Sequence, residues 1–294
     1  MIIGKDAYYS NLLKMQTAMK VFISLVFICL FIIKSNAQVG GAESGKVYQF
    51  NYKVEIPATA GMFALNFLGF SQLSKKPTLD SLYILTLDQE DIWAFDRRIF
   101  RQSSPAPNSI YTISDVGLWL SYVLPSLLFI DDEIRESWLD ITLLYFETQA
   151  INLNLYVWGG PVFTERLRPI IYNDGSWDYK LGKGTTDSFF SGHVSMTAGA
   201  SFFMAKVYSD YHPELGAKKW WLYSAALIPP AIVGYCRYRG FMHFPTDIWL
   251  GAAVGATVGI LGPHFHKIVR KSNKDMAIVP FTGRYTGLAF SMEF

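Results

Sequence analysis

The sequence predicts an all-α fold: a bundle of about six helices embedded in a membrane, followed by a short C-terminal β-hairpin. Two observations support this prediction. First, 51% of the residues are hydrophobic and 16% are aromatic. Second, five windows of 15 to 18 residues carry no charged side chain, which is typical of buried or lipid-facing helices. These windows are residues 116–130, 148–164, 188–205, 220–236 and 248–263.

The N-terminal segment has the pattern of a secretory signal peptide. Lys20 precedes a mostly apolar run, residues 21–33, and small residues follow up to Ala37. We predict cleavage after Ala37, because the run is shorter than the ~20 residues of a spanning helix; the alternative is an uncleaved anchor. Residues 1–18 then form an upstream extension before a start at Met19. The chain is therefore expected to be exported to a bacterial cell envelope membrane.

An N-terminal region, residues 38–113, is expected to contain interfacial helices. Its apolar run, residues 56–73, predicts the sixth helix. Apolar side chains at helical spacing across residues 85–99 predict an amphipathic helix, and the prolines of residues 103–109 predict a loop. The run at 56–73 contains glycines and an asparagine, so we do not expect it to cross a membrane fully.

The last residues have a different pattern. Leu288, Phe290, Met292 and Phe294 alternate with smaller or polar residues after a Thr-Gly turn. This two-residue period predicts a β-hairpin. The predicted organisation is a signal peptide at 1–37, an N-terminal region at 38–113, a helical core at 114–275 and a hairpin tail at 276–294.

Window length alone does not establish membrane insertion. The windows lie at or below the roughly 17 to 25 residues of a typical span, and the mean hydropathy is only +0.19. Gly251, Gly255 and Gly259 form a repeated small-residue face, and tryptophans lie near window ends, which are both features of membrane helices. These features favour a membrane protein over the alternative, a soluble all-α core.

The distribution of basic residues predicts an orientation. If the mature N-terminus is outside and five windows cross, residues 166–187 and 237–243 both face the periplasm. Seven basic residues then lie on the inner side, as the positive-inside rule prefers: Lys206, Lys218, Lys219, Lys267, Arg270, Lys271 and Lys274.

Net charge and cysteine content exclude other classes. The net charge of +2 shows no basic stripe, so nucleic acid is not an expected partner. The two cysteines, Cys29 and Cys236, are too few for a disulfide framework or a zinc site. We expect no cofactor and no metal, and the oligomeric state stays open. Three further histidines are expected to be solvated: His212, His264 and His266.

One cluster of polar residues precedes the last window. Pro245 suits the first turn of a helix, which places Asp247 where the helix dipole stabilises a carboxylate. Asp247 is then within reach of His243, and a carboxylate on one ring nitrogen makes the other more basic and better oriented. Arg237 carries a planar charged group suited to phosphate oxygens.

A second cluster begins another predicted helix. Ser191 suits the N-cap, and the free N–H groups of Gly192 and His193 form an anion site at the helix start. His193 is placed to protonate a leaving oxygen, which contributes a factor of about 10² to 10⁴ in rate. Arg168, next to Pro169 and expected at the end of its helix, supplies another guanidinium.

These residues resemble the three motifs of the phosphatidic acid phosphatase type 2 superfamily, which includes vanadium haloperoxidases and bacterial acid phosphatases. They stand here as Arg168-Pro169, Phe190-Ser191-Gly192-His193, and Cys236-Arg237 with His243 and Asp247. The resemblance implies a metal-independent phosphatase acting on a phosphomonoester or diphosphate, and a lipid phosphate is the substrate we expect. It implies that His243 attacks phosphorus, Asp247 orients it and His193 protonates the leaving group. Arg168, Arg237, Ser191 and Gly192 would hold the phosphate.

One departure from the family pattern leaves alternatives open. The family lysine falls at Pro161, so one positive charge is missing. Arg166 is the nearest replacement and is our candidate for a further phosphate-binding residue; Lys180 and Lys183 are the others. The competing functions are a soluble periplasmic acid phosphatase or haloperoxidase on the same scaffold, and an inactive membrane scaffold.

Overall fold

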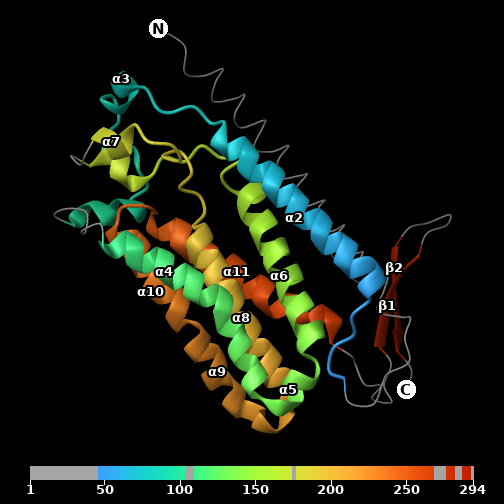
Figure 1. Cartoon of the computed structure of the whole chain (residues 1–294). Coiled ribbons are helices and arrows are strands. Elements are labelled where there is room, and N and C mark those ends of the chain that lie inside the picture. The colour runs from blue at the N-terminus through green and yellow to red at the C-terminus, as the bar shows by residue number, and fades with distance from the viewer. Residues whose placement is uncertain (1–45, 103–108, 174–176, 268–275, 282–286, 293–294) are drawn as a thin grey trace.

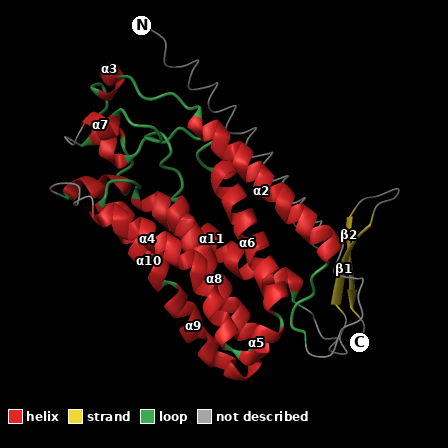
Figure 2. Cartoon of the chain, in the orientation of Figure 1, coloured by secondary structure: helices red, strands yellow, loops and turns green. Residues whose placement is uncertain are grey.

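The structure is a computed structural model that describes residues 46–102, 109–173, 177–267, 276–281 and 287–292. The predicted signal peptide, 1–37, and most of the predicted loop at 103–109 lie outside these residues. The described chain is mostly helical, which confirms the all-α prediction (Figure 1; Figure 2).

In the described part of the chain, six long helices form the bundle: α2 (Tyr52–Ser74), α4 (Ser109–Val123), α6 (Trp138–Gly159), α8 (Gly192–Tyr211), α10 (Ile228–Arg239) and α11 (Pro245–His266). Four short helices lie between them: α3 (Ser81–Ile84), α5 (Asp132–Glu136), α7 (Trp177–Lys180) and α9 (Lys219–Ala226). Five 3₁₀ segments complete the connections: η1 (Gln89–Asp91), η2 (Asp96–Arg101), η3 (Leu124–Ile130), η4 (Pro169–Tyr172) and η5 (Pro213–Lys218).

Helix α8 is the centre of the bundle and packs against α4, α6, α9, α10 and α11 (Figure 1). The glycine face of α11 makes its contact with α8. A Cβ added to Gly255 would lie 2.0 Å from the carbonyl oxygen of Ser195, and one added to Gly251 would lie 2.6 Å from that of Ser191. Because no side chain separates the two backbones, the first turns of α8 and α11 lie side by side.

Several helix boundaries differ from the sequence-based expectation. The window at 220–236 is two helices, α9 and α10, which meet at Leu227 next to the pair Pro229-Pro230. The window at 148–164 belongs to α6, which begins ten residues earlier, at Trp138, and ends before Gly160 and Pro161. Charged residues inside α6 hid its first turns from a search for uncharged windows.

The amphipathic helix predicted for residues 85–99 is wrong. That stretch contains η1 and η2 instead, separated by residues without helical structure. The Asp88 side chain accepts the backbone N–H of Glu90 at 2.9 Å and begins η1. Local capping of this kind competes with a continuous helix.

Two described helical stretches are long and apolar enough to cross a membrane by length and composition: residues 109–130, which comprise α4 and η3, and α11. Crossing by the other predicted windows stays a prediction. Large apolar side chains are exposed on α4, α9, α10 and α11, including Trp119, Leu120, Trp220, Trp221, Ile228, Ile232 and Trp249. A surface of this kind indicates contact with lipid or another apolar partner.

The C-terminal region contains two strands, β1 (Met276–Phe281) and β2 (Gly287–Met292), which pair antiparallel with Met276 opposite Met292. The turn that would join them, 282–286, lies outside the described residues. The predicted hairpin as a unit therefore stays a prediction.

Candidate active site

The start of α8 and the start of α11 meet at one end of the bundle. The backbone N–H of Ser191 donates to the carbonyl oxygen of Asp247 at 3.0 Å, which fixes the two helix starts together. Pro245 is the first residue of α11, as its position in the sequence predicts. Beneath this junction lies a buried apolar cluster of Ile84, Ile99, Ile170, Ile171, Phe241 and Phe244.

His243 lies in the loop between α10 and α11 and is only 2% exposed. Its Nδ1 lies 2.7 Å from the carbonyl oxygen of Ser188, so Nδ1 carries the proton and donates it, which leaves the lone pair on Nε2. Burial lowers the pKa of His243 well below its usual value, and the positive charges of Arg168, Arg237 and His193 lower it further. His243 is therefore a neutral, oriented imidazole close to those three residues.

Asp247 does not make the expected contact with His243. Among the described residues, its Oδ2 accepts the N–H of Phe244 at 2.9 Å and the hydroxyl of Ser188 at 2.7 Å. Its Oδ1 accepts from Arg166. Asp247 thus holds Ser188, and the Ser188 carbonyl in turn holds the His243 ring.

Arg166, the candidate for a further phosphate-binding residue, has its charge paired with carboxylates of the protein. Its two terminal nitrogens bind two buried carboxylates, those of Asp96 and Asp247, and its guanidinium lies 4.7 Å from the Phe244 ring centre. Asp96 is 1% exposed and also accepts the backbone N–H of Thr246 at 3.0 Å. Arg166 therefore fastens the loop and first turn of α11 to η2, because its charge is already paired.

Arg168 has a different environment. It lies in extended backbone just before η4, not at the end of a helix as expected. Its side chain donates to three backbone carbonyls, those of Gly184 at 2.7 Å, Met242 at 3.3 Å and Asp187 at 3.4 Å. No carboxylate pairs with it within the described part of the chain, so its charge remains available for an anion.

Arg237 lies in the last turn of α10 and is 5% exposed. One terminal nitrogen binds Asp115, and Nε has no hydrogen-bond partner among the residues that the structure describes. A buried guanidinium N–H without a partner is costly, and a phosphate oxygen would satisfy it.

His193 and Arg237 share one carboxylate. Nε2 of His193, in the first turn of α8, lies 2.9 Å from Oδ1 of Asp115, which also accepts from Arg237. Asp115 comes from α4 and its side chain is 53% exposed. The sequence analysis missed Asp115, because nothing in the sequence marks an isolated aspartate in an apolar helix as a partner of a distant motif.

The start of α8 has the expected form. Ser191 is its N-cap, but its hydroxyl makes no capping bond and is buried without a partner in the described residues. A Cβ added to Gly192 would lie 2.8 Å from the ring of Tyr156, so only glycine allows that ring to approach the helix start. The free N–H groups and the Ser191 hydroxyl remain as donors for an anion.

A lysine does lie beside Pro161, but it comes from elsewhere in the sequence. Nζ of Lys76, just after α2, binds the Pro161 carbonyl oxygen and lies 2.9 Å from Oδ1 of Asp187. The two candidates from the loop are placed differently. Lys180 lies over the Trp177 ring, and Lys183 donates to the carbonyl oxygen of Ser74 at 3.3 Å.

The structure therefore brings together His243, His193, Arg168, Arg237, Ser191 and Gly192 as candidates for binding and reacting with an anion. Asp247 and Arg166 bind each other and hold the loop between α10 and α11 in place. Four residues missed by the sequence analysis complete the arrangement: Lys76, Asp96, Asp115 and Ser188. Three of these lie far from the motifs in sequence, and Ser188 lies close to one but acts through its carbonyl, which no residue pattern reveals.

A family model agrees with the family resemblance. Residues 142–271 match the family model of the PAP2 superfamily. One solved structure is similar, titled as the crystal structure of the first transmembrane PAP2 type phosphatidylglycerolphosphate phosphatase from Bacillus subtilis. It is 20% identical, with a TM-score of 0.41, and the match covers 70% of this chain and 94% of that one. No curated protein matches this chain.

Proposed function

We propose that this chain, which carries a PAP2 superfamily region in residues 142–271, is a membrane phosphatase that hydrolyses a lipid phosphomonoester or diphosphate. The observation that carries the proposal is the contact of His243 Nδ1 with the Ser188 carbonyl oxygen, which leaves Nε2 of the buried ring as the nucleophile. Two arginines lie near this ring: Arg237, whose Nε has no hydrogen-bond partner among the described residues, and Arg168, which pairs with no carboxylate among them. This arrangement suits an attack on phosphorus.

In the proposed reaction, Nε2 of His243 forms a bond to phosphorus while the bond from phosphorus to the leaving oxygen breaks. His193, which the negative charge of the bound phosphate favours in its protonated form, gives its proton to that oxygen, and the neutral ring then takes a proton from the water that attacks the phosphohistidine. The products are the alcohol or phosphate and inorganic phosphate, and both rings return to their first state. Arg168, Arg237 and the start of α8 stabilise the charge on phosphorus without a metal ion.

A lipid substrate is supported by the surface next to the site. Helix α4 supplies Asp115 to the site, and the same helix exposes Trp119, Leu120 and Val123. A substrate with its phosphate at Arg237 would have apolar protein surface beside its chain. We propose that the site faces the periplasm, as the positive-inside count predicts.

The test is phosphate release from long-chain lipid phosphates by purified protein. We expect wild type to release phosphate and to form a phosphoenzyme that is stable in base and lost in acid. His243→Asn should abolish both with helicity and size unchanged. His264→Asn, which alters an exposed histidine of α11, is the matched control and should keep full activity.

Other outcomes of this assay would contradict the mechanism or support one of the competing functions. Phosphate release by His243→Asn at the wild-type rate refutes the mechanism. No release by folded wild type from any lipid or soluble phosphoester indicates an inactive scaffold. Activity confined to soluble esters in a detergent-free soluble fraction indicates an acid phosphatase, and halide oxidation with added vanadate indicates a haloperoxidase.

A further inference from the structure

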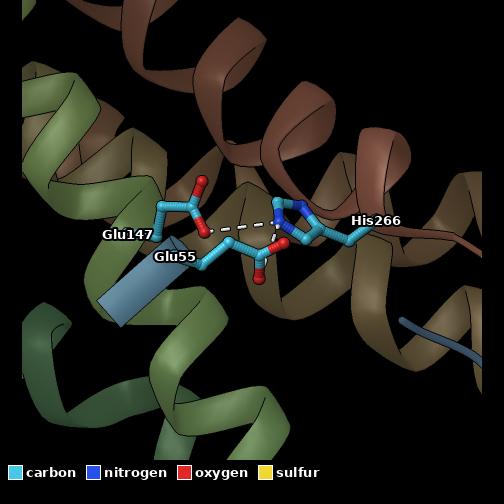
Figure 3. Close-up of side chains that lie close together, drawn as sticks. All are labelled: Glu55, Glu147 and His266. Carbon is cyan, nitrogen blue, oxygen red and sulfur yellow. Dashed lines mark ion pairs between the residues drawn. The ribbon is translucent and has the colours of Figure 1, made fainter. Parts of the chain in front are cut away.

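A second cluster of titratable side chains lies at the opposite end of α11. It consists of Glu55 in the first turn of α2, Glu147 in α6 and His266, the last residue of α11 (Figure 3). A helix of this length separates the cluster from the start of α11 by about 30 Å. The proposed reaction at His243 uses none of the three residues.

The cluster is buried, and three of its polar atoms make no hydrogen bond with any described residue. His266 is 6% exposed and Glu147 is 5% exposed, so the prediction that His266 is solvated is wrong. Oε2 of Glu55, Oε2 of Glu147 and Nε2 of His266 are buried and make no hydrogen bond within the part of the chain described. Three polar atoms of this kind that face one another need an explanation, since each is costly to leave unsatisfied.

The other ring nitrogen of His266, Nδ1, already has a hydrogen-bond partner, so Nε2 is the nitrogen that can bind a ligand. Nδ1 of His266 lies 2.9 Å from the carbonyl oxygen of Gly262, so Nδ1 donates its proton there. Nε2 faces the two carboxylates (Figure 3). Three acceptor atoms that face one another repel unless a proton or a metal ion lies among them.

The distances fit an ion better than a direct hydrogen bond. Nε2 lies 3.3 Å from Oε2 of Glu147 and 3.6 Å from Oε2 of Glu55. A charge-assisted hydrogen bond from a protonated ring would be about 2.7 to 2.9 Å long. Ligands held at about 2.0 to 2.2 Å around a tetrahedral ion are separated by about 3.4 Å.

We propose that Glu55, Glu147 and His266 bind one divalent transition-metal ion of the zinc type. One imidazole nitrogen and two carboxylate oxygens are a ligand set that Zn²⁺ accepts, and the two negative charges neutralise it. The Gly262 carbonyl orients the ring from behind, as outer partners of ligating histidines commonly do. The ion would join α2, α6 and α11 and stabilise the bundle away from the phosphatase site.

The first experiment measures Zn²⁺ binding and thermal unfolding of full-length protein purified in detergent without chelator. Wild type should bind about one Zn²⁺ per chain and unfold at a higher temperature with Zn²⁺ than with EDTA. His266→Gln and Glu147→Gln should each lose at least about 100-fold in Zn²⁺ affinity, because loss of an outer partner alone lowers affinity 10- to 100-fold. Their unfolding temperatures should no longer respond to Zn²⁺.

His212 provides a matched control. It also lies between two carboxylates, but its nitrogens are 2.8 Å from Glu214 and 2.9 Å from Asp131, as expected for satisfied hydrogen bonds. His212→Gln should keep wild-type Zn²⁺ affinity. Should His266→Gln fail to fold, Glu55→Gln carries the same test, because Glu55 is the least buried of the three.

A second measurement uses Co²⁺ in wild type. Bound Co²⁺ should give visible absorption bands of a tetrahedral site, and Zn²⁺ should displace them. Wild type that binds neither ion, or whose unfolding temperature is the same in Zn²⁺ and EDTA, overturns the proposal in favour of a protonated His266 paired with the carboxylates. Wild-type Zn²⁺ affinity in folded His266→Gln overturns it as well. Neither outcome depends on phosphatase activity.

Discussion

The carbonyl oxygen of Ser188 lies 2.7 Å from Nδ1 of His243, and the hydroxyl of the same residue lies 2.7 Å from Oδ2 of Asp247. Ser188 thus takes the place that the sequence analysis gave to Asp247, which was expected to hold the imidazole directly. A neutral carbonyl fixes the tautomer of the ring without placing a negative charge against it. This arrangement leaves the low pKa of His243 in place, whereas a carboxylate would raise it.

The first prediction concerns pH. Because burial and the neighbouring cations lower the pKa of His243 well below its usual value, its Nε2 is unprotonated at pH 6.5. The acid limb of kcat/KM should therefore fall below pH 6.5 in wild type. Arg237→Met removes a positive charge and should move this limb to higher pH while lowering the plateau. A wild-type limb at or above pH 6.5 would contradict the assignment of His243 as the neutral nucleophile.

The second prediction concerns the buried pair behind the loop. Asp96→Asn leaves Arg166 with one carboxylate instead of two and should destabilise the fold by about 3 kcal/mol, the size typical of breaking a buried ion pair. Glu90→Gln is the control, because its pair with Arg97 is exposed, and its effect should stay within about 0.5 kcal/mol. Unfolding in urea measures both. Equal effects of the two substitutions would show that Asp96 does not support the loop.

The third prediction concerns Lys76 as a positioning residue. Lys76→Met removes the contacts to Pro161 and Asp187 and should lower kcat by about 10- to 100-fold with little change in KM, because the loop that carries Ser188 shifts. Lys76→Arg should restore much of the rate. Lys75→Met, on the exposed neighbour, should change neither constant. A loss of stability with kcat unchanged would show a merely structural role.

The fourth prediction concerns Asp115, which occupies the same donors that a phosphate would use. Asp115→Asn removes a negative charge from Arg237 and His193, so inorganic phosphate and vanadate should inhibit about tenfold more tightly, which corresponds to 1.4 kcal/mol. The value of kcat should fall, since His193 loses its orienting partner. Asp132→Asn alters an exposed carboxylate and serves as the control. Weaker inhibition of Asp115→Asn would contradict this account.

The fifth prediction concerns helix packing. Gly255→Ala would place a methyl group 2.0 Å from the Ser195 carbonyl oxygen, so α11 must move away from α8. We expect a loss of about 1 to 3 kcal/mol in stability and a loss of activity. Gly61→Ala on α2 meets nothing within 4 Å and should stabilise the helix by up to about 1 kcal/mol. Thermal unfolding in detergent compares the two, and equal effects would contradict the packing argument.

The parts of the fold that sequence could predict are those determined by neighbouring residues. Uncharged windows located the long helices, and Pro245 and Ser191 marked the starts of α11 and α8. The break at Leu227 also had a local signal, the two prolines that follow it, but the surrounding apolar run concealed it. The start of α6 lay outside the predicted window, because that window contained only uncharged residues and the first turns of α6 contain charged ones.

For the site, too, residues within compact motifs could be predicted from the sequence. His193, Arg237 and His243 belong to compact motifs, so their convergence followed from a family resemblance. The supporting contacts of the site could not be predicted in this way, because their residues are far apart in sequence. Asp115 lies 78 residues from His193, and Asp96 lies 150 residues from Thr246. Such pairs depend on how helices pack, and a residue pattern within one segment does not predict them.

Ser188 links the His243 ring to the Asp247 carboxylate through its own carbonyl and hydroxyl groups. Any substitution or loop movement that displaces this residue alters ring orientation and helix anchoring together, so the two properties do not vary independently. Altering substrate preference by design is therefore better attempted on the exposed apolar residues of α4, such as Trp119 and Leu120, which make no contact with Ser188 or His243 among the interactions described.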